Sequence, residues 1–245
     1  MTGLSESNDK RVFNNILGAI GRTPLVRLGR IAHELPCPLY AKLEFMNPGG
    51  SVKDRIGSTM IDAAEREGRL RPGATIVEAT AGNTGVGLAL AAAAKGYRCV
   101  FVLPDKMSEE KINLLRAHGA EVVITRSNVT RDDPEYYLNV AKRLATEIPG
   151  AWYSDQWSNP NNPLAHYLTT GPEVWDDTDG ELDAYVGGMG TTGTTSGVGR
   201  YLKERKPQIR VIAVEPEGSV FGGGTPAPYK VEGIGNEACA IVKRT

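Results

Sequence analysis

Lys53 is the residue whose position in this sequence most clearly allows chemistry. It lies in the stretch GGSVKDR (residues 49–55), where a glycine turn meets the start of a predicted helix. A helix N-terminus carries partial positive charge and disfavours a cation. The lysine amine is therefore shifted toward its neutral, nucleophilic form, which Schiff-base chemistry requires. A solvated lysine in an ordinary first turn is the alternative, and the other motifs must decide between the two.

The loop TAGNTG (residues 80–85) follows a predicted strand and precedes a predicted helix. Its backbone N–H groups, with two threonine side chains and one asparagine side chain, can hold an anion at a helix N-terminus. A tight turn capped by Asn83 or Thr84 is the alternative. Because a cap needs only one such residue and the loop has three, the pattern favours anion binding.

A second loop, GMGTTGT (residues 188–194), also lies between a strand and a helix. It contains the GxGxxG pattern of dinucleotide sites, and the next strand ends at Glu215, where a ribose-binding acid is expected. This predicts a nicotinamide-dependent oxidoreductase as one alternative. The motif comes late in the chain, however, and its threonines suit a compact terminal phosphate at least as well. Neither loop matches the P-loop of nucleotide hydrolases.

The lysine, the phosphate-binding loop and the anion-binding loop form a set. An enzyme that uses pyridoxal 5'-phosphate needs these parts: a Schiff-base lysine, a phosphate site and a site for the amino-acid carboxylate. The residues by themselves therefore point to that cofactor, beside the nicotinamide alternative.

Alternating strands and helices must position these loops. Strands are predicted at residues 75–80, 99–104, 121–125, 152–154, 184–189 and 209–214. Helices are predicted at residues 85–95, 108–118, 134–148, 163–175 and 195–206. This order predicts an α/β fold with parallel strands, covering helices and ligand sites at the carboxyl ends of the strands. After Glu217 the signals for strands and helices stop, so the sheet is expected to end early.

Composition limits the class of protein. The chain has 245 residues, a formal net charge of -1 and 40% hydrophobic residues, as expected for a globular protein of one large or two small domains. The balanced charge favours neither nucleic acid nor an anionic membrane as a partner. No apolar run reaches the roughly 20 residues of a membrane span, and residues 1–11 lack the apolar core of a signal peptide. Cys37, Cys99 and Cys239 indicate reduced thiols in the cytoplasm, and no metal site is expected.

Four motifs in order resemble those of one family, the fold-type II pyridoxal-phosphate enzymes of the cysteine synthase and cystathionine beta-synthase type. The resemblance covers residues 16–235. The motifs are GRTPLV (21–26), NPGGSVKDR (47–55), TAGNTG (80–85) and GTTGT (190–194). Further stretches are similar to the cystathionine beta-synthase branch: EFMN (44–47), KMSEEK (106–111), DQW (155–157), NPLAHY (162–167) and EPEGS (215–219).

The resemblance implies a tryptophan synthase beta-like fold of two βα domains with largely parallel sheets. Residues 1–45 and 150–245 would form a large cofactor-binding domain, and residues 46–149 a smaller, movable one. Family members continue with further strands and helices, which carry a serine at the pyridine nitrogen. The tail 236–245 resembles nothing in the family at that point. The large domain is therefore expected to be truncated and to expose apolar surface.

The resemblance also implies roles for individual residues. Lys53 would carry the cofactor as a Schiff base, and Asn83 would bind its ring hydroxyl. Its phosphate would be bound by Gly190, Thr191, Thr192, Gly193 and Thr194. The substrate carboxylate would be bound by Thr80, Ala81, Gly82, Thr84 and Gln156. The chain departs from the family at Ala81, where serine is frequent, and at Thr192, where glycine is usual and a branched side chain could crowd the phosphate or add a hydroxyl. His166 is expected to be structural.

The implied activity is a β-replacement on serine or O-acetylserine. The incoming thiol would be homocysteine or sulfide, and the product cystathionine or cysteine. The resemblance implies a cytoplasmic homodimer that acts on small molecules. A truncated, non-catalytic homologue is the alternative from another class, and the early end of the sheet supports it.

Overall fold

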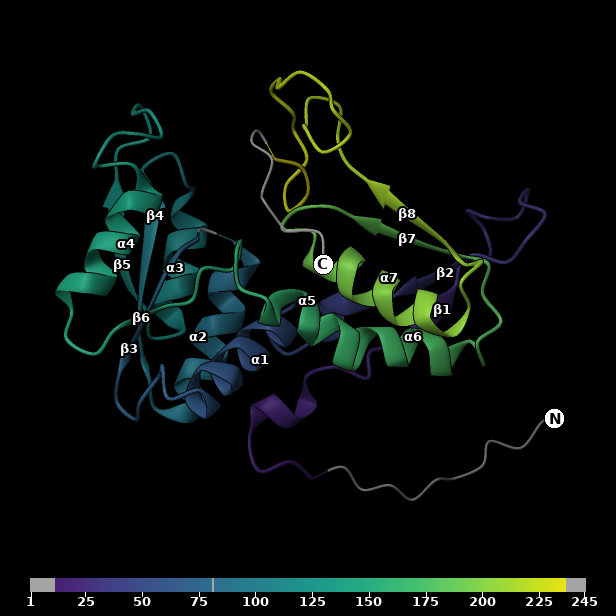
Figure 1. The fold of residues 1–245 in the computed structure, drawn as a ribbon, viewed down its shortest axis with the longest axis horizontal. Helices are drawn as coiled ribbons and strands as arrows, with labels where there is room; N and C mark the ends of the chain where they lie inside the picture. Colours follow the sequence, from purple (N-terminus) through teal and green to yellow (C-terminus); the bar gives the residue numbers. More distant parts are fainter. Residues whose placement is uncertain (1–11, 81, 237–245) are drawn as a thin grey trace.

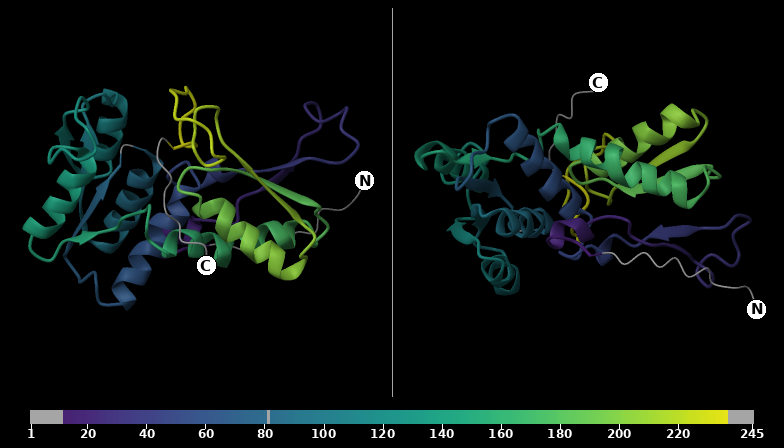
Figure 2. Two further views of the ribbon diagram at one scale, coloured as in Figure 1. Left: turned by 45° about the horizontal axis from the view of Figure 1, so that its top comes forward. Right: turned by 90° about the horizontal axis from the view of Figure 1, so that it is seen from below.

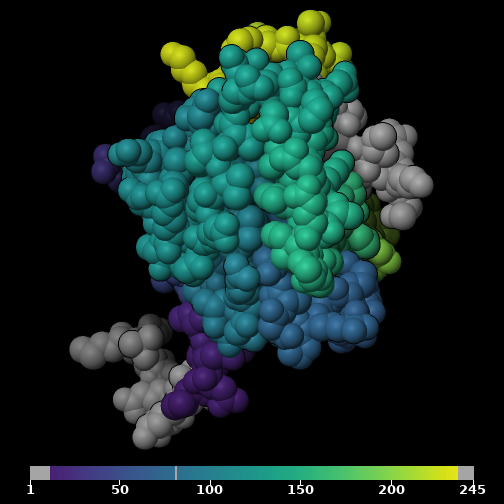
Figure 3. Space-filling model, turned by 90° about the vertical axis from the view of Figure 1, so that its left-hand side faces the viewer, coloured from purple at the N-terminus to yellow at the C-terminus, as the bar shows by residue number. Residues whose placement is uncertain are grey.

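The computed structural model describes residues 12–80 and 82–236 of the chain. Two lobes lie side by side (Figure 1). One contains the elements from α1 to β6, and the other contains α5, α6, α7 and four further strands. Seen from the side of the first lobe, the surface is formed mainly by that lobe, with the loops after β8 rising above it (Figure 3). None of the helices in the described residues is long and apolar enough to span a membrane.

A parallel sheet of four strands forms the centre of the first lobe. Its order is β5-β4-β3-β6. The strands are β3 (Thr75–Ala79), β4 (Arg98–Pro104), β5 (Glu121–Thr125) and β6 (Trp152–Tyr153). All of its neighbouring strands pair in parallel, in the registers Ile76↔Cys99, Ile76↔Trp152 and Val100↔Glu121. Each strand lies within about one residue of its predicted position.

Alternate residues of these strands supply two cores, because successive side chains point to opposite faces of a sheet. Ile76 and Phe101 pack under the helices α1 (Lys53–Arg66), α2 (Asn83–Lys95) and α3 (Glu109–Ala117). Val77 and Val100 pack under α4 (Tyr137–Glu147) on the opposite face. The predicted covering of this sheet on both faces is therefore confirmed.

The first helical segment of the second lobe after β6 is not a regular α-helix. Residues 163–175 are predicted as one helix, but the structure has α5 (Asn161–Ala165), a π-helical turn η3 (His166–Thr170) and α6 (Gly171–Asp177). A widened turn of this kind cannot be read from hydrophobic periodicity, and such turns are frequent at functional sites. α1 packs against α5 and η3, so the helix that begins at Lys53 lies between the two lobes.

The remaining strands form two small sheets. β7 (Ala184–Gly188) and β8 (Arg210–Val214) pair in parallel, and α7 (Gly193–Arg205) connects them. β1 (Leu25–Arg27) and β2 (Tyr40–Lys42) form an antiparallel pair that the sequence did not indicate. Short 3-10 helices lie at Ile16–Ala19 and Glu44–Met46. The α/β class with largely parallel sheets is confirmed, although β7 and β8 do not join the four-stranded sheet.

The described residues after β8 form loops without helix or strand, as the pattern after Glu217 predicts. These loops return toward the centre of the molecule, where the lobes meet (Figure 2). Val186, Ile212 and Val214 of the short sheet are exposed. Apolar surface is therefore exposed on β7 and β8, in the lobe for which the sequence predicts it.

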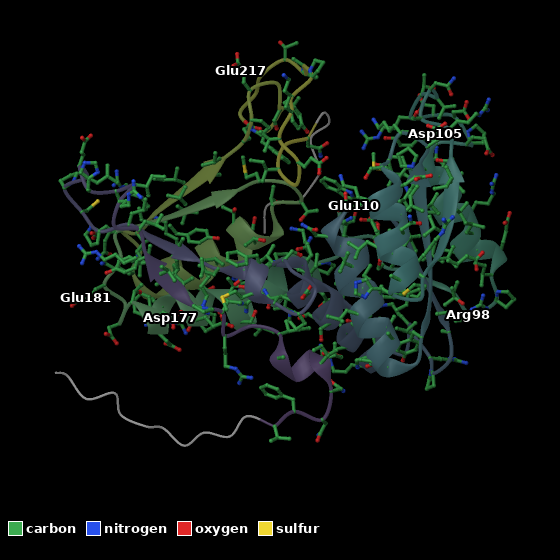
Figure 4. All side chains as sticks on the ribbon, turned by 180° about the vertical axis from the view of Figure 1, so that it is seen from behind. Arg98, Asp105, Glu110, Asp177, Glu181 and Glu217 are labelled. Carbon is green, nitrogen blue, oxygen red and sulfur yellow. The ribbon has the colours of Figure 1, made fainter. Side chains whose placement is uncertain are left out.

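The carboxyl ends of the parallel strands β3 to β8 lie on one side of the molecule (Figure 1). Arg98 and Asp105 mark the two ends of β4, and Asp105 lies on the same side as Glu217 in the loops that follow β8 (Figure 4). The loops after β3 and β7 leave these same ends. Parallel α/β proteins bind ligands at this edge of the sheet, so a binding site is expected there.

Candidate active site

Lys53 is the first residue of α1, as predicted. The Asp54 carboxylate accepts a hydrogen bond from the Gly49 amide at 2.5 Å, which ties the glycine turn to the helix. The side chain of Lys53 is partly buried, and burial lowers the pKa of its amine. The helix dipole predicts the same direction, but the dominant cause here is the removal of the amine from water.

Two glycines bring the start of α1 against the start of α2. A Cβ atom at Gly57 would lie 2.4 Å from the carbonyl carbon of Gly87, which is closer than real Cβ atoms come to backbone. The helices can therefore approach each other only because both positions lack a side chain. This crossing places the Lys53 turn beside the helix that follows the 80–85 loop.

Arg55 anchors the same helix through a buried ion cluster that links the two lobes. Its guanidinium donates to both carboxylate oxygens of Glu44 at 2.7 Å, and to those of Glu173 on α6 at 2.6 and 2.8 Å. Lys42 completes the cluster at 3.0 Å from Glu173. Burial acts to raise the pKa of Glu173, but hydrogen bonds led by that from Arg55 outweigh it and hold the pKa at about 2.

The 80–85 loop opens at the N-terminus of α2 without a side-chain cap. The N-cap residue is Gly82, and neither Asn83 nor Thr84 caps the helix, so the capping interpretation is wrong. Gly82 donates its N–H to the Thr80 hydroxyl at 3.3 Å. Asn83 is exposed at the first position of the helix. Ala81, predicted to contact a substrate carboxylate, lies outside the described residues.

Thr84 and Gln156 meet although 72 residues separate them. The buried Thr84 hydroxyl donates to Oε1 of Gln156 at 2.6 Å. Behind them lies Glu78, fully buried at the end of β3, whose carboxylate accepts from the Gln156 amide at 3.2 Å and from Ser154 Oγ at 2.5 Å. Burial raises the pKa of Glu78 to about 7. Glu78 is not among the residues that the sequence predicts for the site, although a lone acid in the apolar strand TIVEA is a signal.

The 188–194 loop runs directly into α7, which begins at Gly193. The N-cap residue is Thr192, with a φ of 67° and no capping hydrogen bond from its side chain. This left-handed conformation is rare for a β-branched residue and explains why glycine suits the position. The preference for glycine at 192 that the resemblance implies would therefore have a backbone cause.

Two buried side chains hold the threonines on either side of Thr192. Asn162 Nδ2 donates to Thr191 Oγ1 at 2.8 Å, and His166 Nε2 lies 3.1 Å from Thr194 Oγ1. Burial, with a smaller effect from the charges of Lys53 and Arg55, lowers the pKa of His166 to about 3, so its ring is neutral. His166 is fully buried and forms part of the wall behind this loop. That its role is only structural stays a prediction.

Residues 231–235 pack against the 188–194 loop. Gly235 donates its N–H to the Met189 carbonyl at 2.6 Å, and a Cβ atom at Gly190 would lie 2.8 Å from the Gly233 carbonyl oxygen. Glu232 pairs with Lys111 of α3 at 2.7 Å. The last described loop therefore connects the 188–194 loop with a helix of the first lobe.

Glu215, the residue expected to bind a ribose, is engaged by its own loop. Its carboxylate accepts the amide hydrogens of Phe221 at 2.9 Å and Gly222 at 2.5 Å. A dinucleotide site needs this acid to face the ribose. The geometry therefore favours the terminal-phosphate interpretation of the 188–194 loop. Among the described residues, no group of three His, Cys, Asp or Glu side chains could hold a metal ion.

Comparison with known proteins gives one family. Residues 16–243 match the family described as "Pyridoxal-phosphate dependent enzyme". The chain is 49% identical to a cystathionine beta-synthase from Apis mellifera. The match covers 92% of this chain and 46% of that relative. It is also 49% identical to a cysteine synthase from Staphylococcus aureus, covering 92% of this chain and 72% of the relative.

Solved structures with a similar fold have names of the same kind as these relatives. The crystal structure of an O-acetylserine dependent cystathionine beta-synthase from Helicobacter pylori superposes with a TM-score of 0.85 at 41% identity, over 94% of this chain and 75% of that one. The chain spans less than half the length of the cystathionine beta-synthase relatives that it matches.

Proposed function

Because the chain belongs to the family of pyridoxal-phosphate dependent enzymes, we propose that it catalyses a β-replacement on a serine-like amino acid. The family uses pyridoxal 5'-phosphate as its cofactor. In the proposed reaction a thiol replaces the hydroxyl of serine or the acetoxy group of O-acetylserine. The names of the relatives, cystathionine beta-synthase and cysteine synthase, support homocysteine and sulfide as the thiols.

One observation carries the proposal: a continuous set of hydrogen bonds joins the two candidate anion loops. Thr84 donates to the Gln156 side chain at 2.6 Å. Asn162 donates to the Gln156 carbonyl at 2.9 Å and to Thr191 at 2.8 Å. A carboxylate site and a phosphate site fixed relative to each other are what an enzyme needs to align an amino acid with this cofactor.

The donor set fits the cofactor. The residues 190–194 provide three threonine hydroxyls and the amides of a helix start, which suit a phosphate. Lys53 provides an amine with a lowered pKa, which suits the cofactor aldehyde. Asn83, exposed at the mouth of its loop, is available to the ring hydroxyl.

The loop at 80–85 is assigned to the substrate carboxylate. Thr80, Ala81, Gly82 and Thr84 would provide main-chain amides, and Thr80 a hydroxyl as well. Gln156 would provide a side-chain amide, whereas the hydroxyl hydrogen of Thr84 is donated to Gln156. Since Oε1 of Gln156 accepts from Thr84, its NH₂ group is oriented away from Thr84 and is free to donate to a carboxylate.

The proposed role of Lys53 in the reaction is proton transfer. Its amine removes the proton from Cα as a general base and later returns it to the same atom. When bound, pyridoxal 5'-phosphate supplies an electron-withdrawing ring that accepts the negative charge left on Cα. Between the two proton transfers the Cβ–O bond breaks and a Cβ–S bond forms. Homocysteine thereby gives a thioether, cystathionine, and sulfide gives a thiol, cysteine. The second product is water from serine and acetic acid from O-acetylserine.

Movement of the smaller domain, residues 46–149, would close the 80–85 loop over the substrate and exclude water. Residues 1–45 and 150–245 would form the larger, cofactor-binding domain. We further propose a homodimer that acts in the cytoplasm on small molecules.

Titration of the purified protein with pyridoxal 5'-phosphate tests the proposal. We expect visible absorbance from bound cofactor and a cooperative thermal transition that the cofactor raises. Borohydride reduction should then attach the cofactor mass to the peptide that contains Lys53. Lys53→Ala should abolish the attachment, whereas the exposed Lys142→Ala on α4 should not.

A wild-type protein without cofactor absorbance, or attachment that survives Lys53→Ala, contradicts the proposal. With the loaded protein, serine and O-acetylserine should each be combined with homocysteine and with sulfide. The pair that turns over fastest assigns the leaving group and the thiol. A loaded protein that turns over none of the four combinations contradicts the β-replacement.

A further inference from the structure

Asn162 lies between two segments that follow different strands, β6 and β7. It is a residue of α5, with only 3% of its surface exposed. On one side its Nδ2 atom donates to the carbonyl of Gln156 at 2.9 Å, and on the other side to Thr191 Oγ1 at 2.8 Å. One buried amide therefore contacts both the segment assigned to the substrate carboxylate and the loop assigned to the phosphate.

These two hydrogen bonds fix the orientation of the amide. A carbonyl oxygen can only accept, so the atom of Asn162 that faces Gln156 must be the nitrogen. The NH₂ group has two hydrogens, and the two contacts use both. Thr191 Oγ1 therefore accepts from Asn162 and keeps its own hydrogen for another partner. A phosphate, which is rich in acceptor atoms, is a suitable partner for that hydrogen.

The oxygen of the Asn162 amide holds the 188–194 loop in place by packing against it. A Cβ atom at Gly193 would lie 1.9 Å from Asn162 Oδ1, so the amide occupies the space that a side chain at 193 would need. Gly193 is also the first residue of α7. Asn162 thus contacts the start of α7 and the hydroxyl two residues before it, and neither can shift without disturbing the other.

We propose that Asn162 is a positioning residue that sets the phosphate loop and the Gln156 segment in one fixed relation. It orients the Thr191 hydroxyl as a donor toward the cofactor phosphate and holds the Gln156 main chain so that its side chain can meet Thr84. The inference rests on the proposed function, because it assigns a ligand to each of the two segments.

The test compares Asn162→Ala and Asn162→Asp with the matched control Asn161→Ala. Asn161 is the preceding residue and is also buried, at 6% exposure. Its side chain donates only to Asn159 at 3.1 Å among the described residues. Both Asn162 variants should weaken the binding of pyridoxal 5'-phosphate about tenfold. Asn162→Asp should be the weaker binder, since its carboxylate draws the Thr191 hydrogen away from the phosphate and adds negative charge. Asn161→Ala should bind as the wild type does.

A double-mutant cycle separates positioning from a general loss of structure. In a Thr191→Val background the Asn162→Ala substitution should have less effect on cofactor affinity than in the wild type, because the hydroxyl that it orients is absent. The KM for the amino acid should also rise in Asn162→Ala, through Gln156. If Asn162→Ala binds cofactor like Asn161→Ala, or if the two substitutions are additive, the inference is wrong and the proposed function is unaffected.

Amide hydrogen exchange of the cofactor-free protein gives an independent readout. Asn162→Ala should accelerate exchange in both segments, 154–156 and 190–194, more than Asn161→Ala does. If the wild type fails to bind the cofactor, the proposed function fails, and exchange alone then decides the coupling. Equal exchange in the two variants overturns the inference in that case as well.

Discussion

The main-chain carbonyl of Lys53 lies against Gly87, so closely that a Cβ atom at position 87 would be 2.4 Å from its oxygen. Lys53 begins α1, and Gly87 lies in the first turns of α2. The candidate Schiff-base residue is therefore held by backbone packing against the helix that follows the 80–85 loop. The position of the lysine depends on a glycine that has no chemical role of its own.

Gly87→Ala should displace the start of α1. The added methyl group meets backbone, which cannot rotate away as a side chain can, so we expect a loss of at least about 1 kcal/mol in the free energy of unfolding. This loss should appear despite the higher helix propensity of alanine. Denaturant unfolding measures it, and cofactor titration should show weaker binding.

Gly29→Ala is the control for that substitution. No atom lies within 4 Å of the Cβ position at Gly29, and its φ is not in the left-handed region. We expect its unfolding and its cofactor binding to match those of the wild type. A Gly87→Ala variant that behaves like Gly29→Ala would show that the α1–α2 crossing can relax.

Arg55→Met should be strongly destabilising, because it leaves Glu44 and Glu173 without their shared partner. Breaking a buried ion pair by removing one member costs about 3 kcal/mol or more. Urea unfolding at neutral pH measures the loss. Arg98→Met is the control: Arg98 and Glu121 are 71% and 61% exposed and 3.7 Å apart, so we expect at most about 0.5 kcal/mol.

The same variant has a defined pH dependence. The pKa of Glu173 is about 2 in the folded protein, below its ordinary value of 4.5. The unfolded chain therefore binds more protons between these values, and stability from the pair falls as the pH drops from about 4.5 toward 2. The difference in stability between wild type and Arg55→Met should shrink in that window. A difference that stays constant with pH would contradict the assignment.

The loops that define the site could be predicted from the sequence because their signals are local. A run of glycine, threonine and asparagine between an apolar strand and a helix is typical of a turn or an anion-binding loop. TAGNTG and GMGTTGT both lie between a strand and a helix, as predicted. Lys53 was placed correctly at the start of α1 for the same reason. The strands at Thr75–Ala79 and Arg98–Pro104 are apolar runs long enough to recognise.

What the sequence could not provide is the set of partners that are distant along the chain. Arg55 and Glu173 are 118 residues apart, and Asn162 and Thr191 are 29 apart. A local pattern shows that such residues are polar, but it does not identify their partners. The strands β1 and β2 have only three residues each, too few for an alternating pattern to emerge. The assignment of roles to individual site residues remains a prediction.

Thr192→Gly should stabilise the cofactor-free protein. The φ of 67° at Thr192 costs about 1 kcal/mol or more for a β-branched residue, and glycine adopts it without strain. Part of the gain is offset because glycine also loses more backbone entropy on folding. Thermal and denaturant unfolding measure the net effect.

Asp179→Gly controls for the entropy of glycine. Asp179 also has a positive φ, of 51°, but aspartate tolerates this conformation better than threonine does. We therefore expect Thr192→Gly to gain more stability than Asp179→Gly. Equal changes in the two variants would mean that strain at Thr192 is small.

Glu78→Gln should change how stability depends on pH. Burial raises the pKa of Glu78 to about 7, against an ordinary value of 4.5, and hydrogen bonds from Ser154 and Gln156 only partly oppose this. The folded protein thus holds one proton more than the unfolded chain between these values. The contribution of Glu78 to stability therefore falls as the pH rises from about 4.5 to about 7. Glutamine cannot titrate, so this contribution should be absent from the variant.

The measurement is the difference between wild type and Glu78→Gln in urea unfolding at several pH values. The difference is needed because His166, with a pKa lowered to about 3, acts in the opposite direction in part of the same window. Ser154→Ala removes a hydrogen bond that lowers the pKa of Glu78, so the decline in stability should extend to higher pH in that variant. Parallel stability curves for wild type and Glu78→Gln would show that Glu78 is ionised throughout. The Gln156 segment would then be held by a carboxylate between about pH 4.5 and 7, and its position in that window would not depend on this proton.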